Sequence, residues 1–386
     1  MGRQLRLQSF RNSVFTFILR SIVIHNLITH MSDKVEGYIF EKVPASDTEL
    51  ERYTACFNKN GTERTLDNVK WLHQQNIPAI SLIYMAFTGK GEVAAIYTWL
   101  PCYLILNNQK VLGMQSLDTL TDINHRGKGL FPILAKMIES EVVNKDVAAV
   151  YGFPNENSAP GFVKKLLYKY YGEVPFLIKP LGISYLLNKL FRKKASQENT
   201  NVLIPPGAEV HTREGDLIRP IYSFNADYDQ LWDSIKSVIK LGVCRDSSYM
   251  NWRYINKPGE TYSIYGYFKN NILSGVVIFC IKNKHSGRIG YLMELLYDPA
   301  DSNSGKRLLK LASSTIKRNK GQLILAWCSE YSYNYSCYNN AGYFKFPEKL
   351  RPLKLGFIVK SLDKDHGAYV YDLKNWYLSY SDSDTV

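Results

Sequence analysis

Hydrophobic and polar residues follow two different periods along this chain, and together they predict a mixed α/β protein. The stretch MQSLDTLTD alternates apolar and polar residues like a strand, whereas LFPILAKMIESEV repeats its apolar residues at helical spacing. In the first half, the pattern predicts helices at 48–56, 66–75, 130–143 and 158–171, and strands at 80–88, 93–100, 111–121 and 147–152. In the second half, it predicts strands at 262–268, 273–282 and 288–297, and a helix at 306–319.

Two pairs of sequence stretches resemble each other across the chain. Arg64 and Arg245 are each followed seven residues later by a tryptophan, Trp71 and Trp252, and each stretch then enters a tyrosine-rich strand. A second pair, YGFPNENSAPGF and AWCSEYSYNYSC, occurs later in each half and in the same order. A repeat this long predicts two related domains rather than a solenoid. We therefore expect an extension at 1–31, a first domain at 32–190, a linker at 191–210 and a second domain at 211–386.

A glycine-rich, cationic turn lies between a strand and a helix of the first half. In INHRGKGLF, Arg126 and Lys128 alternate with Gly127 and Gly129. The first N–H groups of a helix lack backbone partners and its dipole favours negative charge there, while glycines let an anion approach the backbone. The string matches neither the G-x-x-x-x-G-K-[ST] nucleotide loop nor the G-x-G-x-x-G dinucleotide fingerprint. It predicts a phosphate cradle of another kind, with a solvated surface turn as the alternative.

This turn resembles the pyrophosphate loop of the GNAT acetyltransferase superfamily, whose pattern is [QR]-x-x-G-x-[GA] between a strand and a helix. Arg126 occupies the first position and Gly129 the fourth, while Phe131 stands where the family prefers glycine or alanine and is expected to narrow the loop. The resemblance covers residues 34–171 and extends further only by topology. It implies a mostly antiparallel sheet flanked by helices, in two tandem GNAT-like domains, with acetyl-CoA or another acyl-CoA as co-substrate.

The resemblance also implies a site. Pantetheine is expected beside the strand at 116–122, with the pyrophosphate on the backbone of the turn. Asp118 is the candidate general base, directly or through a water, with a structural hydrogen-bonding role as the alternative; Asp122 and Ser158 are further catalytic candidates. Phe162 stands where family members often carry a tyrosine acid, so that role is vacant or moves to another group. The implied cofactor contacts are Leu120, Thr121, Arg126, Gly127, Lys128, Gly129, Leu130, Phe131 and Asn155.

The second half lacks this turn. After the strand RIGYLMELLYDP it reads ADSNSGKRLLKL, which is a helix start without the R-x-x-G-x-G pattern. Gly305, Lys306 and Arg307 remain an alternative anion site. We expect the first half to bind the coenzyme and carry the chemistry, and the second half to be a degenerate copy that shapes the acceptor pocket or stabilises the whole.

The composition bears on the charge of the ligand, on the cellular compartment and on membrane contact. The net charge of +13 suits an anionic ligand but does not choose among coenzyme A, nucleotide-linked substrates, nucleic acid and acidic lipid. The six scattered cysteines form no C-x-x-C pair, which argues against a zinc site and a disulfide scaffold and favours a reducing cytoplasm. Residues 1–30 carry four arginines and no acid, with Arg20 inside the apolar run, so they fit neither a signal peptide nor a membrane span. We expect a dispensable extension, with a weak amphipathic anchor as the alternative.

The predicted function is acyl-CoA-dependent N-acyl transfer, most simply acetyl transfer to a primary amine of a small molecule such as an amino sugar. The ending NWYLSYSDSDTV resembles GNAT proteins of surface polysaccharide loci, which suggests polysaccharide biosynthesis. The alternatives are an aminoacyl or peptidoglycan-type transferase with paired GNAT-like domains, and a non-catalytic module that binds an anionic partner. No metal and no nucleic acid are expected, contact with a membrane surface stays open, and the sequence does not predict the oligomeric state.

Overall fold

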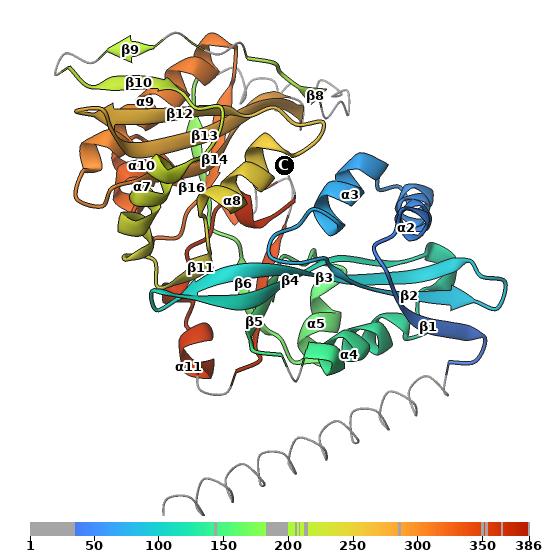
Figure 1. Ribbon diagram of the computed structural model, residues 1–386. Coiled ribbons are helices and arrows are strands. Elements are labelled where there is room, and N and C mark those ends of the chain that lie inside the picture. Colours follow the sequence, from blue (N-terminus) through green and yellow to red (C-terminus); the bar gives the residue numbers. More distant parts are fainter. Residues whose placement is uncertain are drawn as a thin grey trace, which may run out of the picture.

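The computed structural model describes residues 35–142, 145–182, 200–204, 207, 209–211, 215–284, 287–348, 351, 354–363 and 366–384. The predicted extension at 1–31 and residues 191–199 of the predicted linker lie outside the described residues. Two sheets form the architecture, one built mainly from each half of the chain (Figure 1).

The first sheet carries helices on both faces. Its order is β1-β2-β3-β4-β5-β17-β6, antiparallel throughout except for the parallel pair β4–β5. Helices α2 and α3 cover one face and α4 and α5 the other (Figure 1). The strands are β1 (Tyr38–Val43), β2 (Leu82–Thr88), β3 (Val93–Leu106), β4 (Gln109–Thr121), β5 (Val147–Gly152), β6 (Lys169–Glu173) and β17 (Gly356–Ser361), with β11 (Leu241–Val243) paired to β3; the helices are α2 (Asp47–Lys59), α3 (Leu66–His73), α4 (Leu130–Val142) and α5 (Ala159–Leu166).

The second sheet has the same plan, with order β16-β7-β15-β14-β13-β12-β10-β9 and a parallel pair β14–β15. Helix α9 packs on β13 and β14 much as α4 packs on the first sheet. The strands are β7 (Phe176–Pro180), β9 (Val210–His211), β10 (Leu217–Pro220), β12 (Ser263–Lys269), β13 (Ile272–Lys284), β14 (Gly287–Tyr297), β15 (Leu323–Trp327) and β16 (Phe344–Lys345), with β8 (Thr200–Asn201) paired to β13; the helices are α7 (Ala226–Lys236), α8 (Ser247–Met250), α9 (Ser302–Arg318) and α10 (Tyr335–Asn340). Helix α11 (Gly367–Val370) follows β17 and packs against it at the first sheet (Figure 1).

The halves exchange strands: β7 of the first half belongs to the second sheet, and β11 and β17 of the second half belong to the first sheet. Strand β7, from the first half, pairs with β15 and β16, while β17, from the second half, lies between β5 and β6. The largest hydrophobic cluster accordingly contains side chains from both sheets. Because hydrogen-bonded strands cannot separate without breaking their sheets, this exchange fixes the two halves to each other. The domain boundary expected at 190–211 stays a prediction. Strands β7 and β17 each belong to the sheet that is built mainly from residues on the other side of this boundary.

Local signals explain most of the elements, and three expectations need correction. The strand expected at 93–100 continues to Leu106, because residues 101–106 pair with β4. The helix expected at 158–171 ends at Leu166, because Leu167 adopts a left-handed conformation with φ 60° and the chain continues as β6. The helix expected at 306–319 begins earlier, at Ser302, where the Asp301 side chain caps the N–H of Asn303. The short pairing strands β1, β6, β7 and β17 were not expected from the sequence pattern.

The equivalent tryptophans of the predicted repeat meet between the halves. The rings of Trp71 and Trp252 are stacked, with centroids 4.6 Å apart and planes 12° apart. Trp71 Nε1 donates to the carbonyl of Trp252 at 2.9 Å, and Trp252 Nε1 donates to the carbonyl of Trp71 at 3.3 Å. Such reciprocal contacts are typical of two copies of one motif related by an approximate two-fold axis.

Candidate functional site

Strands β4 and β5 separate near the middle of the first sheet. Their parallel pairing ends at Ser116 and Gly152, where a Cβ on Gly152 would lie 2.8 Å from the Ser116 carbonyl oxygen. Beyond that point, residues 117–121 of β4 pair with β3 on one side and leave the edge toward β5 open. The register against β3 shifts here, and Asp118 has φ 48°, as expected of a β-bulge. An open strand edge of this kind can hydrogen-bond an extended, amide-containing ligand.

The predicted phosphate cradle follows directly after the open edge. Gly127 and Gly129 have φ of +78° and +79°, a region that other residues adopt only at a cost, and helix α4 begins at Leu130. Arg126 and Lys128 are exposed; Arg126 Nε donates to the Thr121 carbonyl at 3.4 Å and Lys128 Nζ to the Tyr38 hydroxyl at 2.8 Å. The turn thus combines a helix N-terminus, unobstructed backbone and two cations, which fits a diphosphate.

Asp122 holds the entry to this turn. Its buried carboxylate accepts the Asn124 N–H at 2.9 Å and forms an ion pair with Lys59 at 2.9 Å. Burial raises the pKa of Asp122, but Lys59, the Asn124 N–H and Asn60 outweigh it and lower the pKa to about 2. These contacts assign Asp122 a structural task at the turn, and a catalytic role for it stays a prediction.

The other predicted contacts lie around the opening. The Asn155 Oδ1 accepts the N–H groups of Asn157 and Ser158 and the Ser158 hydroxyl, so Asn155 orders the turn before α5. Phe131 does not narrow the loop as expected; its ring packs inward against Tyr97 and Phe162, at centroid distances of 5.1 and 5.0 Å. Leu120 packs against the cluster beneath α2 and α3.

Asp118 is the centre of a buried polar cluster. Its carboxylate forms an ion pair with Arg64, accepts the Tyr53 hydroxyl at 2.6 Å, and lies 3.8 Å from His73 Nε2. Burial raises the pKa of Asp118. The Arg64 guanidinium, His73 and the Tyr53 hydroxyl lower this pKa by more than burial raises it, so the pKa lies below its usual range. Asp118 is therefore an ionised carboxylate and a weak proton acceptor.

Sequence reasoning did not include Tyr53, Arg64 and His73 in the site. Arg64 carried a usable signal, because it begins the Arg-to-Trp motif that occurs in both halves. It also forms an ion pair with Asp384 at 2.9 Å, and so connects the bulge of β4 to a segment 320 residues later in the chain. Tyr53 and His73 carry no such signal, because only folding brings α2 and α3 to the bulge.

The equivalent opening in the second half is filled. Pairing of β14 with β15 ends at Leu292 and Ala326. Beyond it, Asn334 Nδ2 donates to the Leu295 carbonyl at 2.9 Å, and the Tyr333 hydroxyl accepts the Tyr297 N–H at 3.3 Å. These backbone groups therefore have partners from the chain itself.

The N-terminus of helix α9, which corresponds to the turn before α4, is capped and packed by the chain itself. Asp301 caps α9, and a Cβ on Gly305 would meet the Tyr297 ring at 2.6 Å. Gly305 is thus a packing residue within the helix. This arrangement disfavours the alternative anion site at Gly305, Lys306 and Arg307.

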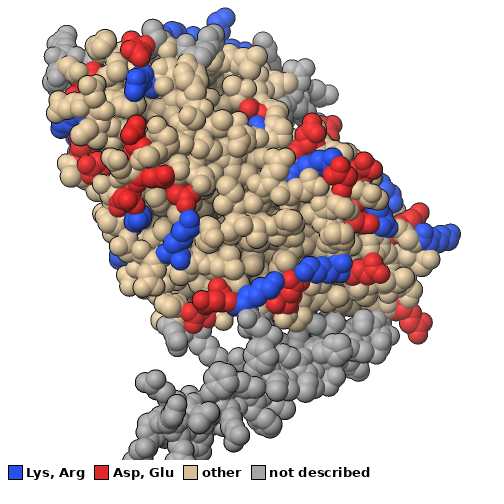
Figure 2. All heavy atoms as spheres, viewed as in Figure 1, with Lys and Arg blue, Asp and Glu red and all other residues tan. Residues whose placement is uncertain are grey.

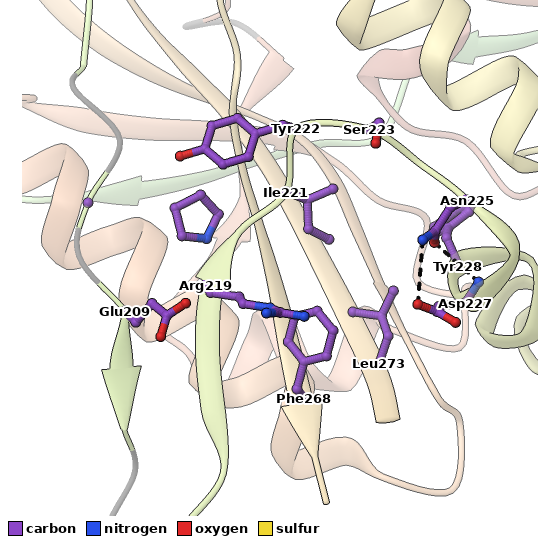
Figure 3. A pocket seen from close by; sticks show the side chains of 12 residues that line it. Glu209, Arg219, Ile221, Tyr222, Ser223, Asn225, Asp227, Tyr228, Phe268 and Leu273 are labelled. Atoms are coloured by element: carbon purple, nitrogen blue, oxygen red, sulfur yellow. Dashed lines mark hydrogen bonds between the residues drawn. The ribbon is translucent and has the colours of Figure 1, made fainter. Parts of the chain in front are cut away.

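A cavity of about 510 Å³ lies in the second half, bounded by β10, β12 and the start of α7 (Figure 3). Two of its polar side chains have local partners: the Arg219 guanidinium stacks 4.3 Å over the Phe268 ring, and the Asn225 side chain accepts the Asp227 N–H. None of its lining residues belongs to the open edge of β4 or to the turn.

The charges on the face in Figure 2 do not form a patch of one sign. Lys and Arg alternate with Asp and Glu toward the rim, and the middle of the face is largely uncharged. Among the described residues, no group of three or more His, Cys, Asp or Glu side chains could hold a metal ion. The six cysteines are all buried and unpaired. None of the described helices has the length and apolar character needed to cross a membrane.

Comparison with known proteins places the fold. Neither a protein-family profile nor a curated protein matches the sequence. A Saccharomyces cerevisiae N-myristoyltransferase with bound myristoyl-CoA is similar with a TM-score of 0.56 and 15% identity, over 84% of this chain and 82% of that chain. A GCN5-related N-acetyltransferase from Anabaena variabilis has a TM-score of 0.58 and 12% identity, over 84% and 73%. A probable N-acyltransferase from Enterococcus faecalis V583 has a TM-score of 0.53 and 13% identity, over 84% and 72%.

These similarities agree with the observed architecture. Each sheet contains one parallel pair of strands, β4–β5 or β14–β15, and a helix, α4 or α9, connects the two strands of the pair. The sequence identities are low, so the comparison concerns the fold. The chain has the fold of the GNAT superfamily, as two tandem GNAT-like domains, and its structural neighbours are N-acyltransferases.

Proposed function

We propose that the first half binds an acyl-CoA and transfers its acyl group to a primary amine. The diphosphate lies on the turn at 126–130, and pantetheine extends along the open edge at 117–121 of β4. The single observation that carries this proposal is that the opening between β4 and β5 is free beside a cationic glycine turn, whereas its equivalent in the second half is filled.

The reaction needs few groups from the protein, because the thioester is already activated. The amine nitrogen attacks the thioester carbon, the C–S bond breaks, the amine loses a proton, and the coenzyme thiolate gains one. Backbone N–H groups at the open edge are suited to stabilise the negative charge that develops on the carbonyl oxygen. In this proposal the amine approaches from the side of the second half, which lies next to the opening on the face opposite α4 and α5 (Figure 1).

Asp118 is kept as the candidate base, but its contacts favour a positioning role. An Arg64 ion pair and a Tyr53 hydroxyl stabilise the charged carboxylate and reduce its tendency to take a proton. In the positioning role, Asp118 orders Arg64 and Tyr53 on the bulge, and a water removes the proton of the amine. The predicted alternatives, Ser158 and Asp122, face the α5 turn and the loop entry respectively.

The acyl group and the acceptor are proposed less narrowly than the coenzyme. Acetyl-CoA is the simplest donor to test, and a small primary amine is the acceptor. An amino sugar is a narrower version of this proposal and belongs in the acceptor panel. Of the alternatives, an aminoacyl transferase predicts turnover without coenzyme A, and a binding module predicts no turnover with any amine.

Calorimetric titration with acetyl-CoA tests the proposal. We expect one coenzyme per chain. Gly129→Glu should weaken binding at least about tenfold, because a charged phosphate contact is worth ~1.5–3 kcal/mol and the new carboxylate repels the diphosphate. Gly342→Glu is the matched control, since Gly342 has φ +83°, is exposed in the second half, and has equal space around it. Equal affinity in both folded variants, or two coenzymes per chain, would contradict the proposal.

A further inference from the structure

A small internal cavity lies where the two halves meet. Its volume is about 30 Å³, and it lies beneath the stacked Trp71 and Trp252 rings. One wall comes from Gln115 and Leu117 of β4, and Leu117 is the first residue beyond the last β4–β5 pair. The opposite wall comes from the π-helical turn Asn251–Ile255 and the C-terminal segment 381–384. The cavity therefore adjoins the edge along which pantetheine is proposed to lie.

Arg253 brings a buried positive charge to this cavity. It is only 3% exposed, and its guanidinium donates to two backbone carbonyls, from Nε to Ser381 at 3.1 Å and from Nη2 to Ser383 at 2.8 Å. Its Nη1 has no hydrogen-bond partner among the residues that the structure describes. Among the described residues, no carboxylate lies within ion-pair distance of Arg253. Burying a cation without an anionic partner is costly, so such a group calls for an anion.

The charged groups around Arg253 are paired with one another. Asp384 forms ion pairs with Arg64 at 2.9 Å and with Lys257 at 3.1 Å, and Asp118 pairs with Arg64. Both carboxylates are thus paired with cations other than Arg253. The adjoining carboxylates of Asp382 and Glu294 pair with Arg245, and Lys282 and Glu260 pair with each other at 2.8 Å.

The repeat shows that packing alone does not require an arginine here. Arg253 follows Trp252, and the residue that follows the equivalent Trp71 is Leu72. Leu72 and Arg253 both line the cavity, one from each half. The first half thus fills its position with an apolar side chain, whereas the second half places a guanidinium there on a π-helical turn, an irregularity frequent at functional sites.

We propose that Arg253 binds the carboxylate of the acceptor, so that the acceptor is an amine that also carries a carboxylate. Apart from the Arg253 guanidinium, much of the lining of this cavity is apolar, including Leu72 and Leu117. Guanidinium and carboxylate match in geometry and charge. Gln115 and Leu117 connect Arg253 to the open edge of β4, so the carbon chain of the acceptor would lie along them with its amine toward the thioester. This assignment rests on the proposed function.

The first experiment needs no turnover. The full chain, with and without coenzyme A, is titrated with acetate and, at matched ionic strength, with acetamide. Tryptophan fluorescence is followed, because Trp71 and Trp252 line the cavity. We expect a saturable response to acetate alone. Arg253→Leu should weaken it at least about tenfold, Arg253→Lys should retain part of it, and Arg219→Leu, which removes the same charge at the other cavity, should leave it unchanged. Equal responses of the unmodified chain to acetate and acetamide would overturn the assignment, even if Arg253→Leu does not fold.

The second experiment measures turnover with paired acceptors, each amine offered as the carboxylate and as its carboxamide, with acetyl-CoA as donor. We expect at least about tenfold higher kcat/KM for the carboxylates, and loss of this preference in Arg253→Leu through KM. A preference for carboxamides, or an unchanged preference in Arg253→Leu, would overturn the assignment. Failure of the proposed function is distinguishable, because acetyl-CoA would then not bind in calorimetry, whereas the acetate response of the cavity does not depend on acyl transfer.

Discussion

The two halves of this chain share a fold and a sequence motif but treat the same opening differently. In the first half, β4 and β5 separate beside a turn with Gly127 and Gly129 in left-handed conformations. In the second half, Asn334 occupies the opening between β14 and β15, and Asp301 caps the helix that follows. A helix start and an open strand edge are available for a ligand only when the chain itself does not satisfy them. One half can therefore keep the fold and lose the cofactor site.

The arginine of the repeated motif shows the same contrast. Arg64 is partly exposed and pairs with Asp118 and Asp384 at the candidate site. Arg245 is fully buried and pairs with Glu294, Asp382 and the Ser379 hydroxyl. Each arginine thus holds one carboxylate from the central strand of its own sheet and one from the C-terminal segment. The buried copy serves the core, and the exposed copy serves the opening.

The largest difference between the halves is expected in the free energy of unfolding when Arg64 or Arg245 is replaced. Arg245→Met should lower the free energy of unfolding by about 3–5 kcal/mol, because Glu294 and Asp382 would remain buried without a cation. Arg64→Met should cost less, since the side chains of Arg64 and its partner Asp384 are 19% and 29% exposed. Urea unfolding followed by circular dichroism measures both. Equal losses would show that the two ion-pair clusters do the same structural work.

The carboxylates paired with these arginines separate chemistry from stability. Asp118→Asn should lower turnover on the order of a hundredfold if Asp118 is the base, while calorimetry shows nearly unchanged affinity for the coenzyme. If Asp118 is a positioning residue, turnover falls less and the pH profile of kcat/KM keeps its shape. Glu294→Gln is the matched variant in the second half and should reduce stability alone. Full turnover in Asp118→Asn would exclude both roles for Asp118.

The smallest difference between the halves is expected for Asp122 and Asp301, the aspartates that cap a helix start in each half. The effect of Asp122 on stability depends on pH. The pKa of Asp122 is lowered to about 2 in the folded chain, so its stabilising effect is complete above the unfolded value of 3.8 and is lost as the pH falls toward 2. Asp122→Asn should cost about 1–2 kcal/mol at pH 6, allowing for the exposed Lys59 partner, and less at pH 2.5. Melting temperatures at both pH values measure this change. A deficit that is constant with pH would contradict the ion-pair explanation.

The same variant tests the link to the site. Because Asp122 fixes the entry to the turn, Asp122→Asn should also weaken acetyl-CoA binding. Asp301→Asn retains a side chain that can cap α9 and lies in the half without the open edge, so coenzyme affinity should not change. Weakened binding in Asp301→Asn alone would reverse the assignment of the halves.

The sequence by itself determined the local elements and the difference between the halves. The strand predicted at 147–152 matches β5, and the helix predicted to begin at residue 130 matches α4, because hydrophobic periodicity and glycine placement act over a few residues. The Arg-to-Trp repeat predicted two related domains, and the turn at Arg126 had no copy in the second half. Each of these signals lies within a short stretch of chain.

Only the tertiary structure decided which distant groups meet. Strands β7 and β17 are short, and their exchange between sheets depends on partners far away in the sequence. The inward turn of Phe131 depends on space left by Gly161, where a Cβ would lie 3.2 Å from its ring. The pairing of Arg64 with Asp118 and the unpaired Nη1 of Arg253 follow from how α3, the bulge of β4 and the C-terminal segment pack. Periodicity cannot predict such contacts, because the free energy of a buried charge depends on every group around it.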